Sequence, residues 1–194
     1  LKEFEELKKE NERLCALTNF IRQNSNYKYV TARVTGKNPG QWFTVFTIGA
    51  GANDGVRKDM AVVNQNGLVG RVIDTGANWS KVMALIDTTS GVSGIVERTR
   101  DNGILKGADP SLGEARLYMQ YLPLDADLMP GDKIITSGID GVFPKGLEIG
   151  EIVEVSRGAE TDSMRKFALV KPAVDFLHLE EVMVIVNQNT QEAQ

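Results

Sequence analysis

The sequence GDKIITSGIDGVFPKGLEIG occupies residues 131–150. It is rich in glycine, yet its apolar residues recur too regularly for a flexible linker. Ile134-Ile135 predicts a short β-strand, and a second strand is expected to begin near Leu147. Between them, glycines permit positive φ angles and Pro144 fixes a rigid turn. We interpret residues 131–150, the glycine-rich block, as a surface shaped by the backbone, which favours a binding or scaffold role over catalysis.

Ten residues of the glycine-rich block are candidates for shaping the turn or binding a partner. They are Gly131, Asp132, Thr136, Ser137, Gly138, Gly141, Phe143, Pro144, Gly146 and Gly150. Phe143 lies between Val142 and Pro144, and we expect it to be exposed and to anchor a partner. Leu147 and Ile149 are expected to fill a core instead.

The β character of the block extends over the chain from residue 27 onward. Short apolar or alternating runs bounded by Gly, Asn or Pro predict about twelve strands, and no sustained 3.6-residue period appears. The expected strands are 29–34, 42–48, 60–63, 68–73, 81–86, 94–97, 103–106, 116–121, 133–136, 150–155, 167–170 and 181–186. Such a number of short strands predicts a mainly β fold with two small six-stranded β-barrels.

The division between the barrels is harder to place. A weak internal echo, GLVGRV at residues 67–72 and GLEIGEI at 146–152, supports two similar modules. Two crossings are compatible with the sequence, the polar stretch 99–103 and residues 170–172. We expect a first barrel over 27–98 plus 171–187, a second over 99–170, and a flexible tail over 188–194.

Residues 1–26 contain a helix with a heptad pattern that predicts a dimerising coiled coil. Its a and d positions are Phe4, Leu7, Asn11, Leu14, Thr18 and Ile21. Asparagine at an a position suits a parallel two-stranded coil, and Glu3 at g faces Lys8 at e of a partner. The alternative is an amphipathic helix that packs on its own domain. Exposed strand edges would also permit higher self-assembly of the resulting homodimer.

Composition excludes several classes of protein. The net charge is −4 and the only basic pair in the helix is Lys8-Lys9, which argues against nucleic-acid binding. No apolar run approaches the roughly 20 residues that span a bilayer. The chain begins in a helical pattern without methionine, so we expect a fragment of a longer protein. Cys15, at an e position, is expected to be a free thiol, with an interchain disulfide as the alternative.

The coiled-coil start, residues 49–60, residues 67–72 and above all the glycine-rich block resemble the MreC family of bacterial cell-shape proteins. The resemblance implies two β-barrels behind a dimerising helix, on the extracytoplasmic side of the membrane and anchored by an N-terminal membrane helix that this fragment lacks. It also implies a scaffold for peptidoglycan synthesis during elongation. The implied partners are a class B penicillin-binding transpeptidase, MreD and MreB.

The barrels of that family have been likened to trypsin-type proteases, so we considered catalysis. His178 is the only histidine, and a Ser137–His178–Asp175 site can be drawn. Three residues is a poor spacing for Asp175 to orient His178 in an extended segment, and no Gly-x-Ser-x-Gly motif is present. We therefore expect no enzyme, no cofactor and no metal site. A peptidoglycan-binding module that stacks sugars on Trp42 and Trp79 is the other alternative.

Overall fold

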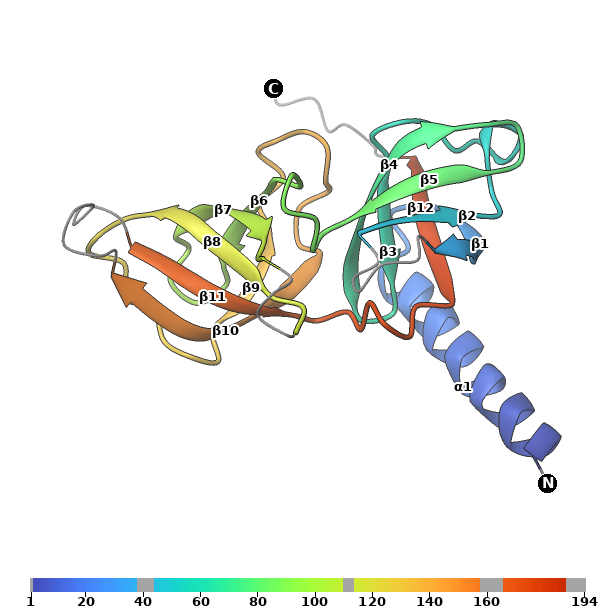
Figure 1. Cartoon of the computed structure of the whole chain (residues 1–194), viewed down its shortest axis with the longest axis horizontal. Coiled ribbons are helices and arrows are strands. Elements are labelled where there is room, and N and C mark those ends of the chain that lie inside the picture. The colour runs from blue at the N-terminus through green and yellow to red at the C-terminus, as the bar shows by residue number, and fades with distance from the viewer. Residues whose placement is uncertain (1, 38–43, 110–113, 158–165, 188–194) are drawn as a thin grey trace.

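Two closed β-barrels follow one α-helix in the computed structural model, which describes residues 2–37, 44–109, 114–157 and 166–187 (Figure 1). Each barrel has six strands, so the predicted mainly β fold with two six-stranded barrels is confirmed. The predicted tail over 188–194 lies outside the described residues.

The first barrel is formed by strands from both ends of the chain, in the ring order β1-β12-β3-β4-β5-β2. Helix α1 (Lys2–Gln23) precedes it, and the short 3-10 helix η1 (Ala52–Asp54) lies between its second and third strands in the chain. The strands are β1 (Lys28–Lys37), β2 (Val45–Ile48), β3 (Ala61–Asn64), β4 (Gly67–Thr75), β5 (Ser80–Ala84) and β12 (Glu181–Asn187).

The second barrel is inserted between β5 and β12, with the ring order β10-β11-β8-β7-β6-β9. Its strands are β6 (Val92–Val96), β7 (Asn102–Gly107), β8 (Leu117–Leu122), β9 (Lys133–Thr136), β10 (Glu148–Arg157) and β11 (Lys166–Pro172). All neighbouring strands in both barrels are antiparallel. Ring closure leaves these two sheets without an open edge, which corrects our expectation of exposed strand edges for self-assembly.

The predicted boundary at residue 99 is wrong. Strand β6 pairs with β7 and β9, so the second barrel already begins at Val92. The polar residues 99–103 belong to the β6–β7 hairpin, where the Val96 amide donates to the Asp101 carbonyl at 2.9 Å. A hairpin turn and a domain crossing are both rich in polar residues, so composition cannot distinguish them. Only the pairing of the strands on either side does.

The internal echo has a structural counterpart. Strands β3-β4-β5 and β9-β10-β11 each form a three-stranded meander, and the echoed segments open the two middle strands. A Cβ atom on Gly70 would lie 2.0 Å from the Met83 carbonyl oxygen, and one on Gly150 would lie 2.1 Å from that of Lys171. Glycine is therefore required at the same place in both barrels, where a neighbouring strand approaches closely.

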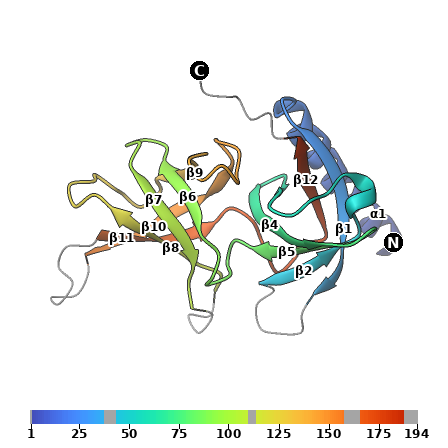
Figure 2. The same ribbon diagram turned by 90° about the horizontal axis from the view of Figure 1, so that it is seen from above.

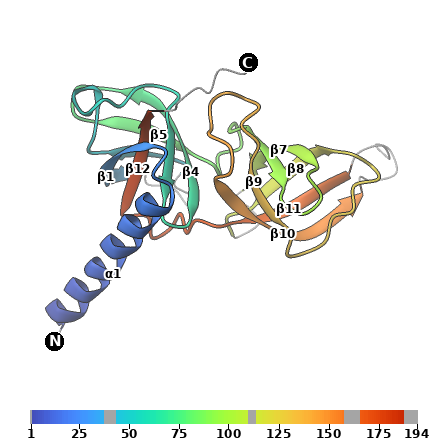
Figure 3. The same cartoon turned by 180° about the vertical axis from the view of Figure 1, so that it is seen from behind.

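The barrels lie side by side, and helix α1 projects from the first barrel away from the second (Figures 2 and 3). Alternating side chains fill each barrel, as in β7, where every second residue is buried. Ile48 and Leu68 are fully buried in strands of the first barrel, as are Ile134 and Ile149 in strands of the second. The predicted core position of Leu147 and Ile149 is thereby confirmed.

Candidate functional site

The glycine-rich block consists of β9, an eleven-residue connection and the start of β10. Thr136, which is fully buried, closes this connection with its side chain. Its hydroxyl donates to the Pro144 carbonyl and accepts the Leu147 amide at 2.9 Å, while its carbonyl accepts the Gly146 amide at 3.0 Å. The two ends of the turn are thus held together at one residue, which makes the turn a rigid surface.

Ser137 and Asp140 fasten the tip of the turn to strand β6. The Ser137 hydroxyl donates to the Ser93 carbonyl at 3.2 Å, and the Asp140 carboxylate accepts the Ser93 amide at 3.2 Å. Between them, Ile139 is 72% exposed. The tip therefore presents an apolar side chain to solvent from a backbone that is hydrogen-bonded on both sides.

Phe143 is buried, contrary to our prediction that it is an exposed anchor. It is 4% exposed and belongs to the hydrophobic core. The Asp140 carboxylate accepts the amides of Val142 and Phe143 at 3.1 and 3.2 Å, which turns the chain back toward the barrel directly after the tip. The exposed apolar residue of the block is Ile139 instead.

Asp132, at the beginning of the block, is held by Arg98 through a bidentate ion pair. The guanidinium nitrogens lie 2.7 and 2.8 Å from the two carboxylate oxygens, and a further contact joins Arg98 to Asp127 at 3.1 Å. These hydrogen bonds lower the pKa of Asp132 and raise that of Arg98. The Arg98 clamp was missed in the sequence because nothing in the local pattern relates residues 34 positions apart.

Acid is expected to loosen this clamp. The folded-state pKa of Asp132 is depressed below its unfolded value of about 3.9, so its contribution to stability is present above that value and is lost as the pH falls through the folded-state pKa. We predict that Asp132→Asn flattens the fall in unfolding free energy between about pH 5 and pH 2, measured by urea denaturation. A variant whose pH profile keeps the wild-type slope would contradict this role; Asp101→Asn, on the nearby hairpin, is the control.

Five of the six predicted coiled-coil positions of helix α1 lie outside the face that contacts the first barrel. Phe4, Leu7 and Leu14 are 72%, 64% and 47% exposed, and Asn11 and Thr18 are also exposed. These five positions leave an apolar stripe with one central amide open along the helix.

A neighbouring face of the helix packs on the first barrel. Leu17 is 4% exposed, and Phe20 packs against the same core. Arg13 pairs with Glu180 at 2.9 Å and with Glu181 at 3.1 Å. Ile21, the last predicted d residue, is also partly buried against the core, so the free stripe ends before it. Packing on its own barrel therefore holds for one face of the helix, while pairing of the exposed stripe with a second chain remains a prediction.

Cys15 is exposed beside the stripe. Its thiol lies 3.6 Å from the Asn11 side-chain oxygen. That Cys15 is a free thiol, and not half of an interchain disulfide, remains a prediction.

The drawn catalytic triad is not assembled. The His178 Nδ1 atom lies 2.7 Å from an Asp175 carboxylate oxygen. Our expectation that Asp175 does not orient His178 assumed an extended segment and was wrong, because residues 175–178 form a turn. A turn closed by the Leu177 amide donating to Asp175 brings the two together. Both side chains are exposed, and this contact lowers the pKa of Asp175. Ser137, however, bonds to Ser93, and no hydrogen bond joins it to His178 within the described residues.

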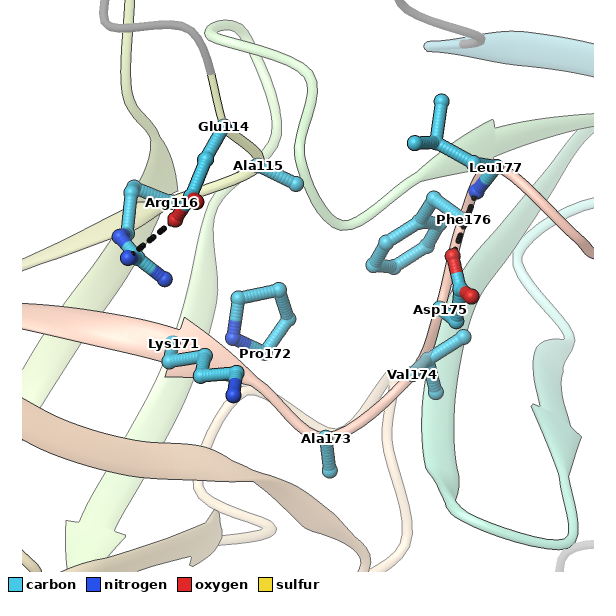
Figure 4. Close-up of a pocket in the computed structure, with 10 residues that line it drawn as sticks. All are labelled: Glu114, Ala115, Arg116, Lys171, Pro172, Ala173, Val174, Asp175, Phe176 and Leu177. Carbon is cyan, nitrogen blue, oxygen red and sulfur yellow. Dashed lines mark hydrogen bonds and ion pairs between the residues drawn. The ribbon is translucent and has the colours of Figure 1, made fainter.

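An open groove of about 630 Å³ lies between the barrels along the segment that returns from β11 to β12 (Figure 4). Arg116 on its wall is paired with Glu114, and Asp175 accepts the Leu177 amide. Its described lining contains no Ser, Cys or His side chain. The groove thus combines charged side chains such as Lys171 and Asp175 with apolar ones such as Val174 and Phe176.

The sugar-stacking alternative has one residue in the described part of the chain. Trp79 is 40% exposed, with the Lys81 ammonium 5.9 Å from its ring centroid and Gly76 packed against the ring. Trp42 lies outside the described residues. Across the described ranges, no helix is long and apolar enough to cross a membrane, and no three His, Cys, Asp or Glu side chains gather closely enough to hold a metal ion.

Comparison with known proteins agrees with this architecture. The family model for the barrel core of the rod shape-determining protein MreC matches residues 34–186. The cell shape-determining protein MreC of Listeria monocytogenes is 36% identical over 188 residues, which cover 94% of this chain and 62% of that protein. The chain thus spans less than two thirds of the length of that relative.

Solved structures share the fold. One MreC structure has a TM-score of 0.83 and 26% identity, and the alignment covers 92% of this chain and 98% of that one. An MreC chain from Helicobacter pylori, solved in a complex with the penicillin-binding protein PBP2, has a TM-score of 0.63 and 17% identity, with coverage of 82% and 99%. The latter likeness concerns the fold alone.

Proposed function

The chain belongs to the MreC family of rod shape-determining proteins, and from this premise we propose that it is a non-enzymatic scaffold that dimerises and docks a peptidoglycan synthase during cell elongation. The observation that carries the proposal is the division of helix α1 into two faces. One face is bound to the first barrel through Leu17 and Arg13, while the other leaves the Phe4–Leu14 stripe exposed. Such a helix joins two chains without releasing either barrel.

The partner we propose is the extracytoplasmic domain of a class B penicillin-binding transpeptidase. The support is the Helicobacter pylori complex, in which an MreC chain of this fold binds PBP2. In the same proposal the chain lies on the extracytoplasmic side of the cell membrane, held by an N-terminal membrane helix beyond this fragment, and works with MreD and MreB.

The second barrel offers a surface for this contact. Ser137 and Asp140, on either side of Ile139, are hydrogen-bonded to Ser93. The β6–β7 register places Ile104 directly opposite Ser93. Ile104 is itself 37% exposed. On its other side, Ile104 pairs with Gln120, which precedes the exposed Tyr121. Ile139, Ile104 and Tyr121 form what we name the barrel-2 patch.

Strand β8 has an irregularity at this patch. Between Leu122 and Met119, two residues of β8 oppose one residue of β11, and Tyr121 adopts a φ of 60°. Bulges of this kind redirect a side chain, and a positive φ is uncommon for residues other than glycine. The bulge turns both Gln120 and Tyr121 outward, which enlarges the patch.

Charge placed on the barrel-2 patch is expected to weaken binding of the transpeptidase domain. We predict that the double substitution Ile104→Asp and Ile139→Asp lowers affinity about tenfold or more in titration calorimetry, because central apolar contacts commonly contribute over 1 kcal/mol each. Leu177→Asp, which changes an exposed apolar residue outside the patch, is the matched control. Equal affinity of the folded double variant and the control would place the contact elsewhere.

A further inference from the structure

The two barrels touch through their backbones at Gly67 and Glu148. Gly67 begins β4 in the first barrel, and a Cβ atom on it would lie 2.3 Å from the Glu148 carbonyl oxygen on β10 of the second. Gly67 is buried and has a φ of +152°. A carbon atom cannot approach a carbonyl oxygen so closely, so any larger residue requires a shift of the backbone at this contact between the barrels.

Each side of this contact is also held by interactions within its own barrel. On the first barrel, the buried Asn64 side-chain oxygen accepts the Asn66 and Gly67 amides at 2.9 and 3.1 Å, which sets the β3–β4 turn. On the second, Glu148 lies at a register shift between β9 and β10, and its carboxylate pairs with Lys133 at 3.4 Å. The contact thus joins two stiff parts of the chain.

The first crossing segment, residues 85–91, is bound to both barrels. The Leu85 amide donates to the Val69 carbonyl in the first barrel at 2.8 Å. The Gly107 amide of the second barrel donates to the Asp87 carbonyl at 3.2 Å. A Cβ atom on Gly107 would lie 2.0 Å from the Ile86 carbonyl oxygen, so this passage is also a direct backbone contact.

The returning segment, residues 173–180, is anchored in the same region. The Ala173 amide donates at 2.9 Å to the carbonyl of Ile149, which follows Glu148 directly. Val174 and Phe176 are both buried in the hydrophobic core. The Gly67–Glu148 contact and both crossings together leave no freely jointed linker between the barrels within the described residues.

We infer that Gly67 is a positioning residue, whose missing side chain lets the two barrels lock into one rigid body through the Glu148 carbonyl. Because Glu148 lies within the glycine-rich block, the lock also fixes that block relative to helix α1. The functional consequence of the lock rests on the proposed function: by fixing the block relative to helix α1, the lock sets the angle at which the barrel-2 patch faces a partner.

Residue-resolved amide hydrogen exchange tests the lock in the unaltered chain. The Gly107 amide of the second barrel donates to Asp87 in the first crossing segment, so in a rigid body it exchanges only through the same large-scale opening as core strand amides such as those of Val72 and Ile152. Exchange of Gly107 more than tenfold faster than expected from that common opening would show that the barrels separate locally, and would overturn the inference.

The substitution Gly67→Ala provides the second test. We expect the Gly107 amide to exchange at least tenfold faster in this variant, while the interior of each barrel keeps its protection. Gly55→Ala is the control for backbone strain, because Gly55 has a φ of +88° and nothing lies within 4 Å of its added methyl group. Gly91→Ala, in a crossing segment with open space around it, controls for substitution of a linker glycine. A Gly67→Ala variant that exchanges like Gly55→Ala would contradict the inference.

Transpeptidase binding separates this inference from the proposed function. Faster exchange of the crossings in Gly67→Ala supports the lock whether or not the transpeptidase domain binds. Absence of binding by the wild-type chain bears on the proposed scaffold role alone.

Discussion

Replacing Phe143 with alanine is expected to lower the free energy of unfolding by about 3–5 kcal/mol. The ring is buried in the second barrel, and its removal leaves a cavity that the surrounding side chains fill only in part. The turn that holds it is fixed by Asp140 and Thr136, so the backbone has little freedom to collapse onto the space. Urea denaturation of the purified chain measures the loss.

Ile139→Ala is the matched control for this prediction. It lies four residues earlier in the same turn but is exposed, so its truncation should change the unfolding free energy by no more than about 0.5 kcal/mol. If Phe143→Ala were as stable as Ile139→Ala, the ring would not be a core residue, and the burial described here would be incorrect.

The combined substitution of Leu7 and Leu14 by glutamate is expected to convert the proposed dimer into a monomer of 21.3 kDa. Both residues are exposed d positions of the heptad, where a partner helix would pack, and four buried glutamates per dimer would have no opposite charges to meet. Light scattering during gel filtration measures the mass. The barrels should remain folded, because these residues do not belong to the core cluster.

Asn19→Glu controls for an added charge on the same helix, since this exposed residue lies at a b position away from the stripe. It should leave the dimer intact. A wild-type chain that is already monomeric at concentrations of about 100 μM would contradict the coiled-coil role of the helix.

The sequence pattern predicted the elements of the fold well, because each depends on local periodicity. Alternation and turn residues located the strands, and their number indicated two barrels. The boundary at residue 99 failed because a hairpin and a crossing both consist of short polar residues. Only the pairing of β6 with β9, about forty positions away, shows to which barrel the hairpin belongs.

The rigid shape of the glycine-rich block was predictable from the sequence, but the exposure of its side chains was not. The glycine-rich block does form a rigid turn, yet the side chain of Asp140 determines that Ile139 points out and Phe143 points in. The Arg98 clamp and the Gly67–Glu148 contact join residues far apart in the chain. Neither contact leaves a local signal in the sequence. Arg98 cannot be distinguished there from an unpaired arginine, nor Gly67 from an ordinary turn glycine.

The most direct test of the scaffold role is the mass of the complex between this chain and the extracytoplasmic domain of a class B penicillin-binding transpeptidase from the same organism. Gel filtration with light scattering should give one species that contains two copies of each protein, since each chain of the dimer carries its own barrel-2 patch. If the two proteins elute separately, each at its own mass, at concentrations where this chain is a folded dimer, the proposal that it docks the synthase is contradicted.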